Sequence, residues 1–309
     1  MKFLLTFEKI IFMVQSKFRG TGVAIVTPFR KDDSVDFNSL SNLVEHIIVN
    51  KAEYIVVLGT TGETPTLTKD EKKAIVSFVV EAVNKRVPLV VGLGGYNTQD
   101  VVDKIKKNNF DGIDAVLSVT PYYNKPNQKG LYSHFQAIAS TCPIPVIIYN
   151  VPGRTGCNIT AETTLKLAHD FNGQFLGIKE ASGNFAQIMK IVQGKPDNFL
   201  VISGDDAITL PMISIGASGV ISVVANAFPK EFSTMVRKAL EMKYDEARQI
   251  HYRILEIIEN LFVEGSPAGI KAALNILGLV QNQVRMPLTP VSRTTYNKLS
   301  ELIKVFKAK

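Results

Sequence analysis

The chain has 309 residues, 46% of them hydrophobic and 20% charged, so it can bury a large core. No apolar run approaches the roughly 20 residues that a membrane-spanning helix needs, so no membrane contact is expected. The net charge of +7 comes from dispersed basic residues without interleaved aromatic residues. This pattern favours a solvated basic surface and small anionic substrates over nucleic acid.

The cysteines and the first residues bear on the compartment in which the protein works. Cys142 and Cys157 form neither a CxxC pair nor a disulfide pattern, so we expect a reducing cytoplasm. Lys2 precedes an apolar stretch that resembles a signal peptide, but charged residues interrupt it and no small-residue cleavage site follows. Residues 1–19 are therefore predicted to be an extension outside the fold, with Met13 as an alternative start.

From residue 22 to about residue 242, apolar segments rich in β-branched residues alternate with segments of helical periodicity. Strands are predicted at residues 22–27, 54–58, 87–92, 115–119, 145–149, 175–179, 200–203 and 219–223. Helices are predicted at residues 36–50, 68–84, 98–108, 129–140, 161–169, 185–193, 207–215 and 230–241. Strands that are apolar on both faces and joined by helices are typical of a helix-covered parallel sheet. Eight such units favour a closed (β/α)8 TIM barrel, an α/β fold, over an open sheet.

The remainder of the chain, residues 243–309, shows only helical patterns and follows the barrel of residues 20–242 without a low-complexity linker. We expect a C-terminal helical region of about three helices. The second and third are predicted at residues 267–277 and 294–306. The first is predicted to present one apolar face made of Tyr252, Leu255, Ile258 and Leu261.

The active site of such a barrel lies at the carboxyl ends of the strands, so the residues that follow each strand are the most informative. After the second strand, residues 59–63 read Gly-Thr-Thr-Gly-Glu, whose turn, hydroxyls and amides suit a carboxylate. Taken alone, this segment is more typical of an ordinary loop before a helix capped by Thr68. After the fourth strand come Tyr122 and Tyr123, which suit either an interface or proton transfer.

The fifth and sixth strands end in residues with more specific chemistry. The fifth ends in Tyr149, and Arg154 follows on a loop shaped by proline and glycine. There, Arg154 suits either bidentate carboxylate binding or a surface salt bridge. The sixth strand ends in Lys179. If Lys179 points into the barrel mouth, partial burial favours a neutral, nucleophilic amine, whereas an outward lysine would extend to solvent; periodicity alone does not separate the two.

The seventh and eighth strands contribute fewer candidates. Gly204, Asp205 and Asp206 follow the seventh strand. Because no histidine is near in the sequence, Asp206 is interpreted as a helix N-cap and not as a metal ligand. Residues 219–222 of the eighth strand could line the floor of the pocket.

The remaining chemistry-bearing residues argue against the common alternatives. The histidines fall within predicted helices, away from the strand ends, at His46, His134, His169 and His251. Their placement disfavours a histidine metal site or a Ser-His-Asp triad, and no GxGxxG or P-loop motif is present. No metal and no organic cofactor is expected. Lys179 remains the candidate nucleophile at the carboxyl ends of the strands. A lysine nucleophile at this face favours carbonyl chemistry through an imine.

Together these segments resemble the dihydrodipicolinate synthase family, within the pyruvate-dependent class I aldolases that include N-acetylneuraminate lyase. The resemblance runs from about residue 20 to about residue 302. The features shared with the wider group are the 59–63 loop, Tyr149 and Lys179. The features typical of the synthases are the double threonine at 60–61 and the loops at 121–124 and 150–156. The combination is specific, whereas any one feature alone is weak.

The resemblance implies a lyase that condenses pyruvate with L-aspartate 4-semialdehyde in diaminopimelate and lysine biosynthesis. By this resemblance Lys179 forms a Schiff base with pyruvate, and Tyr149 moves protons during imine formation and cyclisation. Thr61 links Tyr149 to Tyr123, which enters from a neighbouring subunit across a tight-dimer interface. The resemblance therefore also implies a homo-oligomer, a homotetramer built from two tight dimers.

The same resemblance implies a set of substrate-binding residues. Thr60 and Thr61 hold the pyruvate carboxylate, and Arg154 at the pocket entrance binds the carboxylate of the semialdehyde. Gly204 and Ile221 shape the pocket through backbone atoms.

One departure concerns feedback control. Family members that lysine inhibits carry histidines on the helix after the second strand, where this chain has Lys69 and Lys72. Their charges should repel the ammonium groups of a bound lysine. Tyr122 and Glu63 remain, so an inter-subunit cleft can persist. We expect weak or absent inhibition by L-lysine.

Two other functions remain open from the sequence. Another aldolase of the same group, acting on N-acetylneuraminate or a 2-keto-3-deoxy sugar acid, would keep Lys179 and Tyr149 but would not need Arg154 or the double threonine. A non-catalytic ligand-binding barrel is also compatible with the fold, because barrels host many functions. The joint presence of Lys179, Tyr149, Thr61 and Arg154 argues against such a binder.

Overall fold

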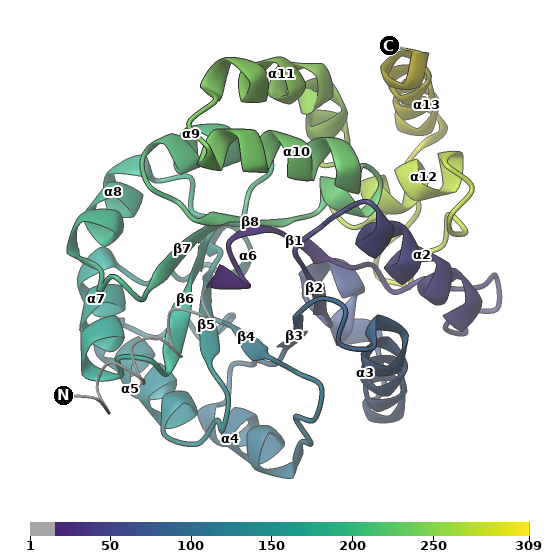
Figure 1. Cartoon of the computed structure of the whole chain (residues 1–309). Helices are drawn as coiled ribbons and strands as arrows, with labels where there is room; N and C mark the ends of the chain where they lie inside the picture. Colours follow the sequence, from purple (N-terminus) through teal and green to yellow (C-terminus); the bar gives the residue numbers. More distant parts are fainter. Residues whose placement is uncertain (1–15, 309) are drawn as a thin grey trace.

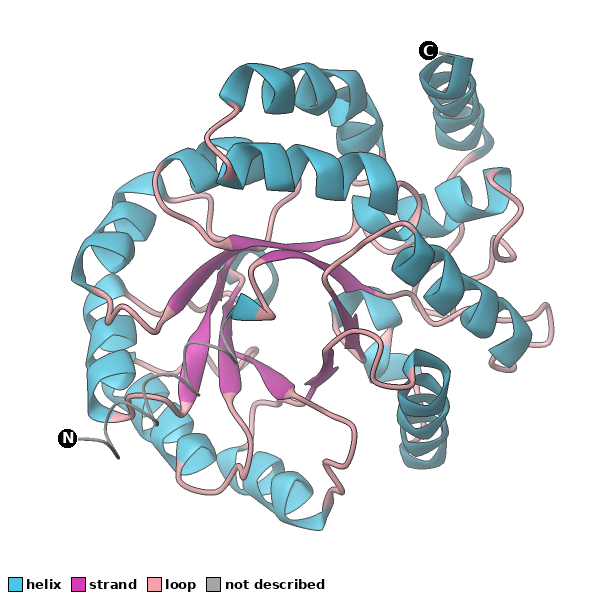
Figure 2. Cartoon of the chain, in the orientation of Figure 1, coloured by secondary structure: helices cyan, strands magenta, loops and turns pink. Residues whose placement is uncertain are grey.

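The structure, a computed structural model, describes residues 16–308 of the chain. Eight parallel strands pair in sequence order and close into one barrel, with β8 beside β1, and helices surround it (Figures 1 and 2). The strands are β1 (Gly20–Ala24), β2 (Tyr54–Val57), β3 (Leu89–Gly92), β4 (Ala115–Val119), β5 (Val146–Asn150), β6 (Phe175–Glu180), β7 (Leu200–Ser203) and β8 (Gly219–Ser222). The predicted (β/α)8 barrel is confirmed.

The helices that follow the strands match the predicted segments within a few residues. They are α2 (Phe37–Val49), α3 (Lys69–Val83), α4 (Thr98–Lys107), α5 (Gln128–Ala139), α7 (Ala161–Asp170), α8 (Phe185–Gly194), α9 (Thr209–Ser214) and α10 (Pro229–Leu240). Short helical turns at the strand ends were not predicted: η1 (Thr60–Gly62), η2 (Thr64–Thr66), α6 (Pro152–Thr155) and η3 (Val224–Asn226). Thr68 caps α3 as expected, in a reciprocal pair with Glu71.

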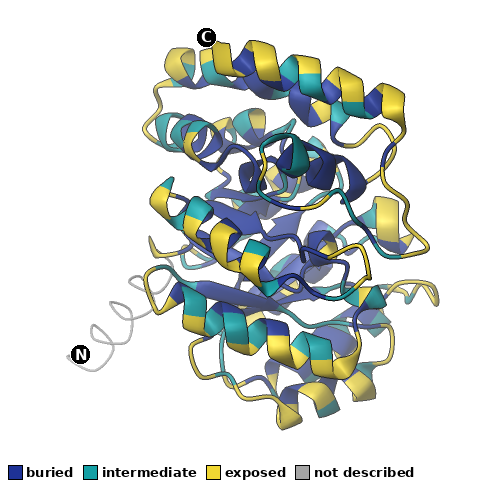
Figure 3. Cartoon of the chain, turned by 90° about the vertical axis from the view of Figure 1, so that its right-hand side faces the viewer, coloured by how far each residue is buried: buried dark blue, intermediate teal, exposed yellow. Residues whose placement is uncertain are grey.

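The barrel has two apolar layers because successive side chains of a strand point to opposite faces. In β2, Tyr54 and Val56 fill the barrel interior, whereas Ile55 packs outward against the helices. Figure 3 shows the buried strands at the centre and exposed positions on the outer helix faces. Within the inner layer Phe18 is fully buried and packs edge-on against Tyr54, with ring centroids 5.3 Å apart. Residue 18, which was expected to belong to the extension, is therefore part of the packed fold. Most of the expected extension, including Met13, lies outside the described residues.

The C-terminal helical region consists of α11 (Tyr244–Asn260), α12 (Ala268–Ile276) and α13 (Arg293–Ala308). The expected boundary after residue 242 coincides with the turn between α10 and α11. The predicted apolar face of this helix was only partly right: Ile258 and Leu261 are buried, whereas Tyr252 is 66% exposed. The buried stripe also includes His251 and Ile254, which were not predicted. Because histidine is partly polar, the presence of one within the buried stripe made the stripe hard to recognise in the sequence. Within residues 16–308, no helix has both the length and the apolar composition to cross a membrane.

Candidate active site

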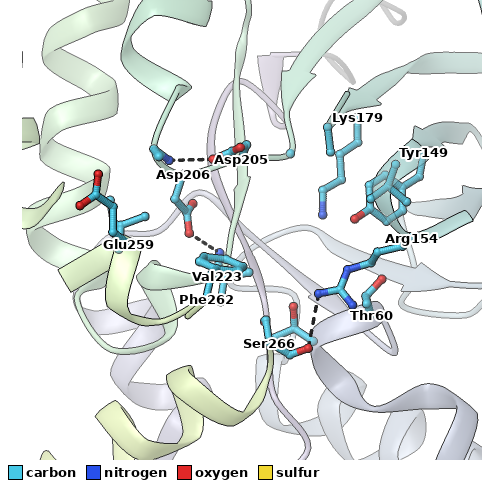
Figure 4. Close-up of a pocket in the computed structure, with 16 residues that line it drawn as sticks. Thr60, Tyr149, Arg154, Lys179, Asp205, Asp206, Val223, Glu259, Phe262 and Ser266 are labelled. Carbon is cyan, nitrogen blue, oxygen red and sulfur yellow. Dashed lines mark hydrogen bonds between the residues drawn. The ribbon is translucent and has the colours of Figure 1, made fainter. Parts of the chain in front are cut away.

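A cavity of about 400 Å³ opens at the carboxyl ends of the strands (Figure 4). Its wall draws on the ends of β5 and β6 and on the segments that follow β2, β5, β7 and β8, with a further contribution from α11. The lining residues are Thr60, Thr61, Tyr149, Val151, Arg154, Lys179, Ala181, Gly204, Asp205, Asp206, Ala207, Val223, Ile258, Glu259, Phe262 and Ser266. Most of the predicted site residues therefore meet in one cavity.

Lys179 and Tyr149 face one another inside this cavity. They are register partners on the neighbouring strands β6 and β5. The ammonium nitrogen of Lys179 lies 4.3 Å from the centroid of the Tyr149 ring, and the lysine is only 5% exposed (Figure 4). Of the two orientations considered for this lysine, the structure has the inward one. A buried amine beside a phenol is an arrangement suited to attack on a carbonyl carbon and to transfer of the protons involved.

The next residues on both strands point outward and fix this arrangement from behind. Asn150 and Glu180 are also register partners, and both are fully buried. Asn150 Nδ2 donates to both carboxylate oxygens of Glu180 at 3.1 and 3.2 Å. The Ser182 amide and Gln187 Nε2 donate to the same carboxylate at 2.8 and 3.0 Å. Because side chains alternate along a strand, this outward polar cluster directs Lys179 and Tyr149 inward.

Gly204 and Ile221 have different positions relative to the cavity. Gly204 lines it, and a Cβ added there would lie 2.7 Å from Ala181 Cβ and 3.1 Å from Lys179 Cε. The absent side chain therefore leaves room for the lysine. Ile221 is not among the lining residues; it is 1% exposed and belongs to the apolar layer inside the barrel.

The double threonine forms η1 at the edge of the cavity, where both threonines line the wall. Two hydrogen bonds shape this segment: Thr27 Oγ1 donates to the Gly62 carbonyl at 2.8 Å, and Thr64 Oγ1 donates to the Leu58 carbonyl at 2.8 Å. These hydrogen bonds hold the turn to the segment that follows β1 and to the end of β2.

Arg154 lies on α6 and extends across the cavity toward the C-terminal region (Figure 4). Its guanidinium donates one long hydrogen bond, 3.4 Å, to the Ser266 carbonyl. Within residues 16–308 it forms no ion pair, so the surface salt bridge considered from the sequence is not present. A planar cation with free donors in a cavity suits a carboxylate ligand.

The wall provided by the C-terminal region was not predicted. Ile258, Glu259, Phe262 and Ser266 all lie after residue 243, far from the strand ends in sequence. The only sequence signal was an apolar pair at the end of a helix, Phe262 and Val263, which are 40% and 67% exposed.

The interpretation of Asp206 as a helix N-cap was wrong. Ile208 occupies the N-cap position of α9, and Asp206 is 2% exposed. Its Oδ2 accepts from the amides of Val223 and Val224 at 2.9 and 2.7 Å. Burial raises the pKa of Asp206 to about 6, although the hydrogen bonds by themselves would lower the pKa. The carboxylate ties the β7 loop to the end of β8, a long-range contact that local spacing could not reveal.

Tyr123 is the one predicted catalytic residue that this chain does not bring into its own cavity. It is 88% exposed and adopts a left-handed backbone with φ of 68°. Its neighbour Tyr122 packs edge-on against Tyr96, with ring centroids 5.2 Å apart. The loop thus presents aromatic side chains on the surface of the monomer.

The histidines remain on the helices, away from the cavity. Burial lowers the pKa of His134 to about 4, and its Nδ1 shares a hydrogen bond with Thr98 Oγ1 at 2.8 Å. Among the residues that the structure describes, no group of three or more histidine, cysteine or acidic side chains is placed to hold a metal ion.

Comparisons with known proteins agree on one family. A sequence profile of the Dihydrodipicolinate synthetase family matches residues 17–306. A 4-hydroxy-tetrahydrodipicolinate synthase from Parabacteroides distasonis is 53% identical over 292 residues, which cover 94% of this chain and 98% of that protein. A solved structure described as the first monomeric dihydrodipicolinate synthase variant has a TM-score of 0.92 at 38% identity, covering 95% of this chain and 98% of its own. The enzyme from Cyanidioschyzon merolae with lysine bound has a TM-score of 0.91 at 37% identity, covering 95% and 99%.

Proposed function

The chain belongs to the dihydrodipicolinate synthetase family, and from this premise we propose that it is a 4-hydroxy-tetrahydrodipicolinate synthase. It condenses pyruvate with L-aspartate 4-semialdehyde in diaminopimelate and lysine biosynthesis. The observation that carries the proposal is the buried amine of Lys179, which faces Tyr149 in a cavity that Arg154 also lines.

The chemistry begins at Lys179. Its amine attacks the keto carbon of pyruvate, and water leaves to form a protonated imine. The imine withdraws electrons, so the pyruvate methyl group loses a proton and becomes an enamine. The enamine carbon then attacks the aldehyde carbon of the second substrate and forms the new carbon–carbon bond. Finally, the amine of that substrate attacks the imine carbon, closes the ring and releases Lys179.

Proton transfers in these steps are assigned to Tyr149, the phenol beside Lys179. Thr61 lines the same cavity and is 4% exposed, so it suits a hydrogen-bonded relay to Tyr149. Thr60 and Thr61 bind the pyruvate carboxylate through hydroxyl and amide groups. Gly204 and Ile221 contribute backbone atoms, although only Gly204 lines the cavity directly.

The second substrate binds through its carboxylate to Arg154. The guanidinium lines the cavity and, among the described residues, is engaged only by one long hydrogen bond to a neutral carbonyl. This assignment favours the semialdehyde over a sugar acid, for which an arginine at this place is not expected.

We further propose that the enzyme works in the cytoplasm as a homotetramer of two tight dimers, with Tyr123 completing a partner's site. The support is the 88% exposure of Tyr123 in a single chain. One of the similar structures is described as a monomeric variant, so the oligomeric state of this chain needs a direct test. Sedimentation should give a tetramer, and Tyr123→Phe should lower turnover; a fully active monomer would contradict both statements.

The decisive experiment is borohydride reduction in the presence of pyruvate, followed by mass spectrometry of peptides. We expect a reduced pyruvyl adduct on Lys179 and none in Lys179→Ala, which should also lack turnover. Lys190→Ala, a change on the outer helix α8, is the matched control and should trap normally.

The same assay separates the competing functions. Absence of any adduct would favour a non-catalytic binder. An adduct with no condensation of the semialdehyde, but with cleavage of sugar acids, would favour another aldolase.

A further inference from the structure

A buried ion pair joins the C-terminal helical region to the loop that carries the double threonine. Lys271 lies on α12, and Glu63 directly follows η1. Their side chains form an ion pair, and both are 0% exposed. The two residues come from opposite ends of the sequence, so the contact exists only in the folded chain. Neither residue lines the cavity or takes part in the proposed chemistry.

Glu63 is held from two sides by the C-terminal region. Lys271 contacts one carboxylate oxygen, and the Arg285 amide donates to the other at 2.9 Å. Lys271 also donates to the Gln283 carbonyl at 2.8 Å, which orients its amine. The Phe29 ring lies 4.1 Å from that amine, measured to the ring centroid, and supplies a cation–π contact.

The side chain of Arg285 reinforces the same connection. Its Nη1 donates to Glu71 Oε2 at 2.9 Å and to the Thr66 carbonyl at 2.9 Å. Glu71 is part of the capping box of α3, and Thr66 is in η2. Arg285 therefore contacts the segment between η1 and α3 at Glu63 and Thr66, and the first turn of α3 at Glu71.

Glu63 controls the end of the threonine turn. It adopts a left-handed backbone with φ of 53°, and its amide donates to the Thr60 carbonyl at 3.2 Å. A non-glycine residue keeps this conformation only where its surroundings enforce it. The ion pair supplies that enforcement, because the carboxylate would otherwise be buried without a counter-charge.

Burial of a charged pair is a poor source of stability, since apolar residues of similar size often stabilise as well or better. The location of this ion pair next to the threonine turn offers a better explanation of its presence. We propose that Lys271, acting through Glu63, is a positioning residue that sets the orientation of Thr60 and Thr61 toward the carboxylate of the keto acid. This inference rests on the proposed function, in which the two threonines bind pyruvate.

The test measures pyruvate affinity apart from turnover. The readout is the pyruvate concentration that gives half-maximal borohydride trapping on Lys179. The main variant is the double change Glu63→Gln with Lys271→Met, which removes both charges and leaves no buried ion unpaired. We expect its half-saturating pyruvate concentration to rise on the order of tenfold or more, because small displacements of binding groups are costly. The KM for the semialdehyde, which depends on Arg154, should change little.

Two further variants keep the result interpretable. Lys298→Met removes an exposed ion pair with Glu256 in the same region and should leave pyruvate trapping unchanged. Glu63→Gln alone leaves the Lys271 ammonium buried without its counter-charge, so it should raise the half-saturating pyruvate concentration at least as much as the double variant.

The outcomes separate the two claims. Normal trapping in the unchanged protein, with half-saturation in the double variant within twofold of it, would overturn the positioning role alone. Lower thermal stability with unchanged half-saturation has the same meaning, since a purely structural brace would act in that way. Failure of the unchanged protein to trap pyruvate would overturn the proposed function, and this inference with it.

Discussion

Arg154→Ala separates the two half-reactions of the proposed mechanism. The guanidinium lines the cavity together with Lys179, and its one hydrogen bond within residues 16–308 is the long one to the Ser266 carbonyl. The substitution therefore removes little that holds the fold together. It should remove the cation that recognises the second substrate and leave the first step, imine formation with pyruvate, largely intact.

The magnitude follows from the interaction that is lost. A hydrogen bond to a charged group contributes about 1.5–3 kcal/mol. At about 1.4 kcal/mol for each factor of ten, kcat/KM for the semialdehyde should fall roughly 10- to 150-fold. Arg154→Lys keeps the charge but loses the planar fork, so its loss should be intermediate.

The assay pairs two measurements on each variant. Initial rates of condensation are recorded at saturating pyruvate with varied semialdehyde, and borohydride trapping of pyruvate is recorded without the semialdehyde. Arg248→Ala is the matched control, because that arginine pairs with Asp245 on the exposed side of α11. If Arg154→Ala condensed at the normal rate, or lost trapping as severely as condensation, the assigned role of the arginine would be refuted.

The remaining predictions concern proton transfer, feedback and pH. Tyr149→Phe should lower kcat on the order of 10²- to 10⁴-fold by removing the general acid–base, as single-turnover kinetics will show; a near-normal kcat would place the proton donor elsewhere. L-lysine should inhibit weakly or not at all because Lys69 and Lys72 present positive charge on α3, and strong inhibition in a titration at modest lysine concentrations would contradict this. Burial raises the pKa of Asp206 from 3.8 to about 6, so the folded chain holds a proton that the unfolded chain releases between these values. The stability that this proton contributes is present below pH 3.8 and lost as the pH rises through about 6, by roughly 3 kcal/mol in total. Asp206→Asn should abolish this loss, and denaturant unfolding that gives both proteins the same pH profile would show that Asp206 does not titrate in this range.

The structure changes one premise of the prediction about inhibition by L-lysine. The sequence left Glu63 available for an inter-subunit cleft, but its carboxylate is buried against Lys271. It therefore cannot serve a surface ligand without breaking that pair. Burial, followed by the positive charge of the neighbouring Lys104, lowers the pKa of Lys72.

Most of the fold was predictable because its signals are local. Each barrel strand is a short apolar run, and each surrounding helix has its own periodicity and cap, as the box of Thr68 and Glu71 illustrates. The failures arose where the residue type alone suggested the wrong environment. The stripe of α11 was predicted only in part because it includes the buried His251, and Asp206 looked like a cap because aspartate commonly occupies that position.

The core of the candidate site was predictable for a reason of topology. A closed parallel barrel gathers the carboxyl ends of all its strands at one mouth, so Lys179, Tyr149, Arg154 and the double threonine had to lie near each other. Only the three-dimensional arrangement decided that Lys179 turns inward, that Ile221 belongs to the inner apolar layer and not to the cavity wall, and that α11 forms part of that wall. The bond between Glu63 and the Arg285 amide spans 222 positions of the chain. No period or turn motif encodes such a contact, because it depends on how the finished barrel packs against the helices that follow it.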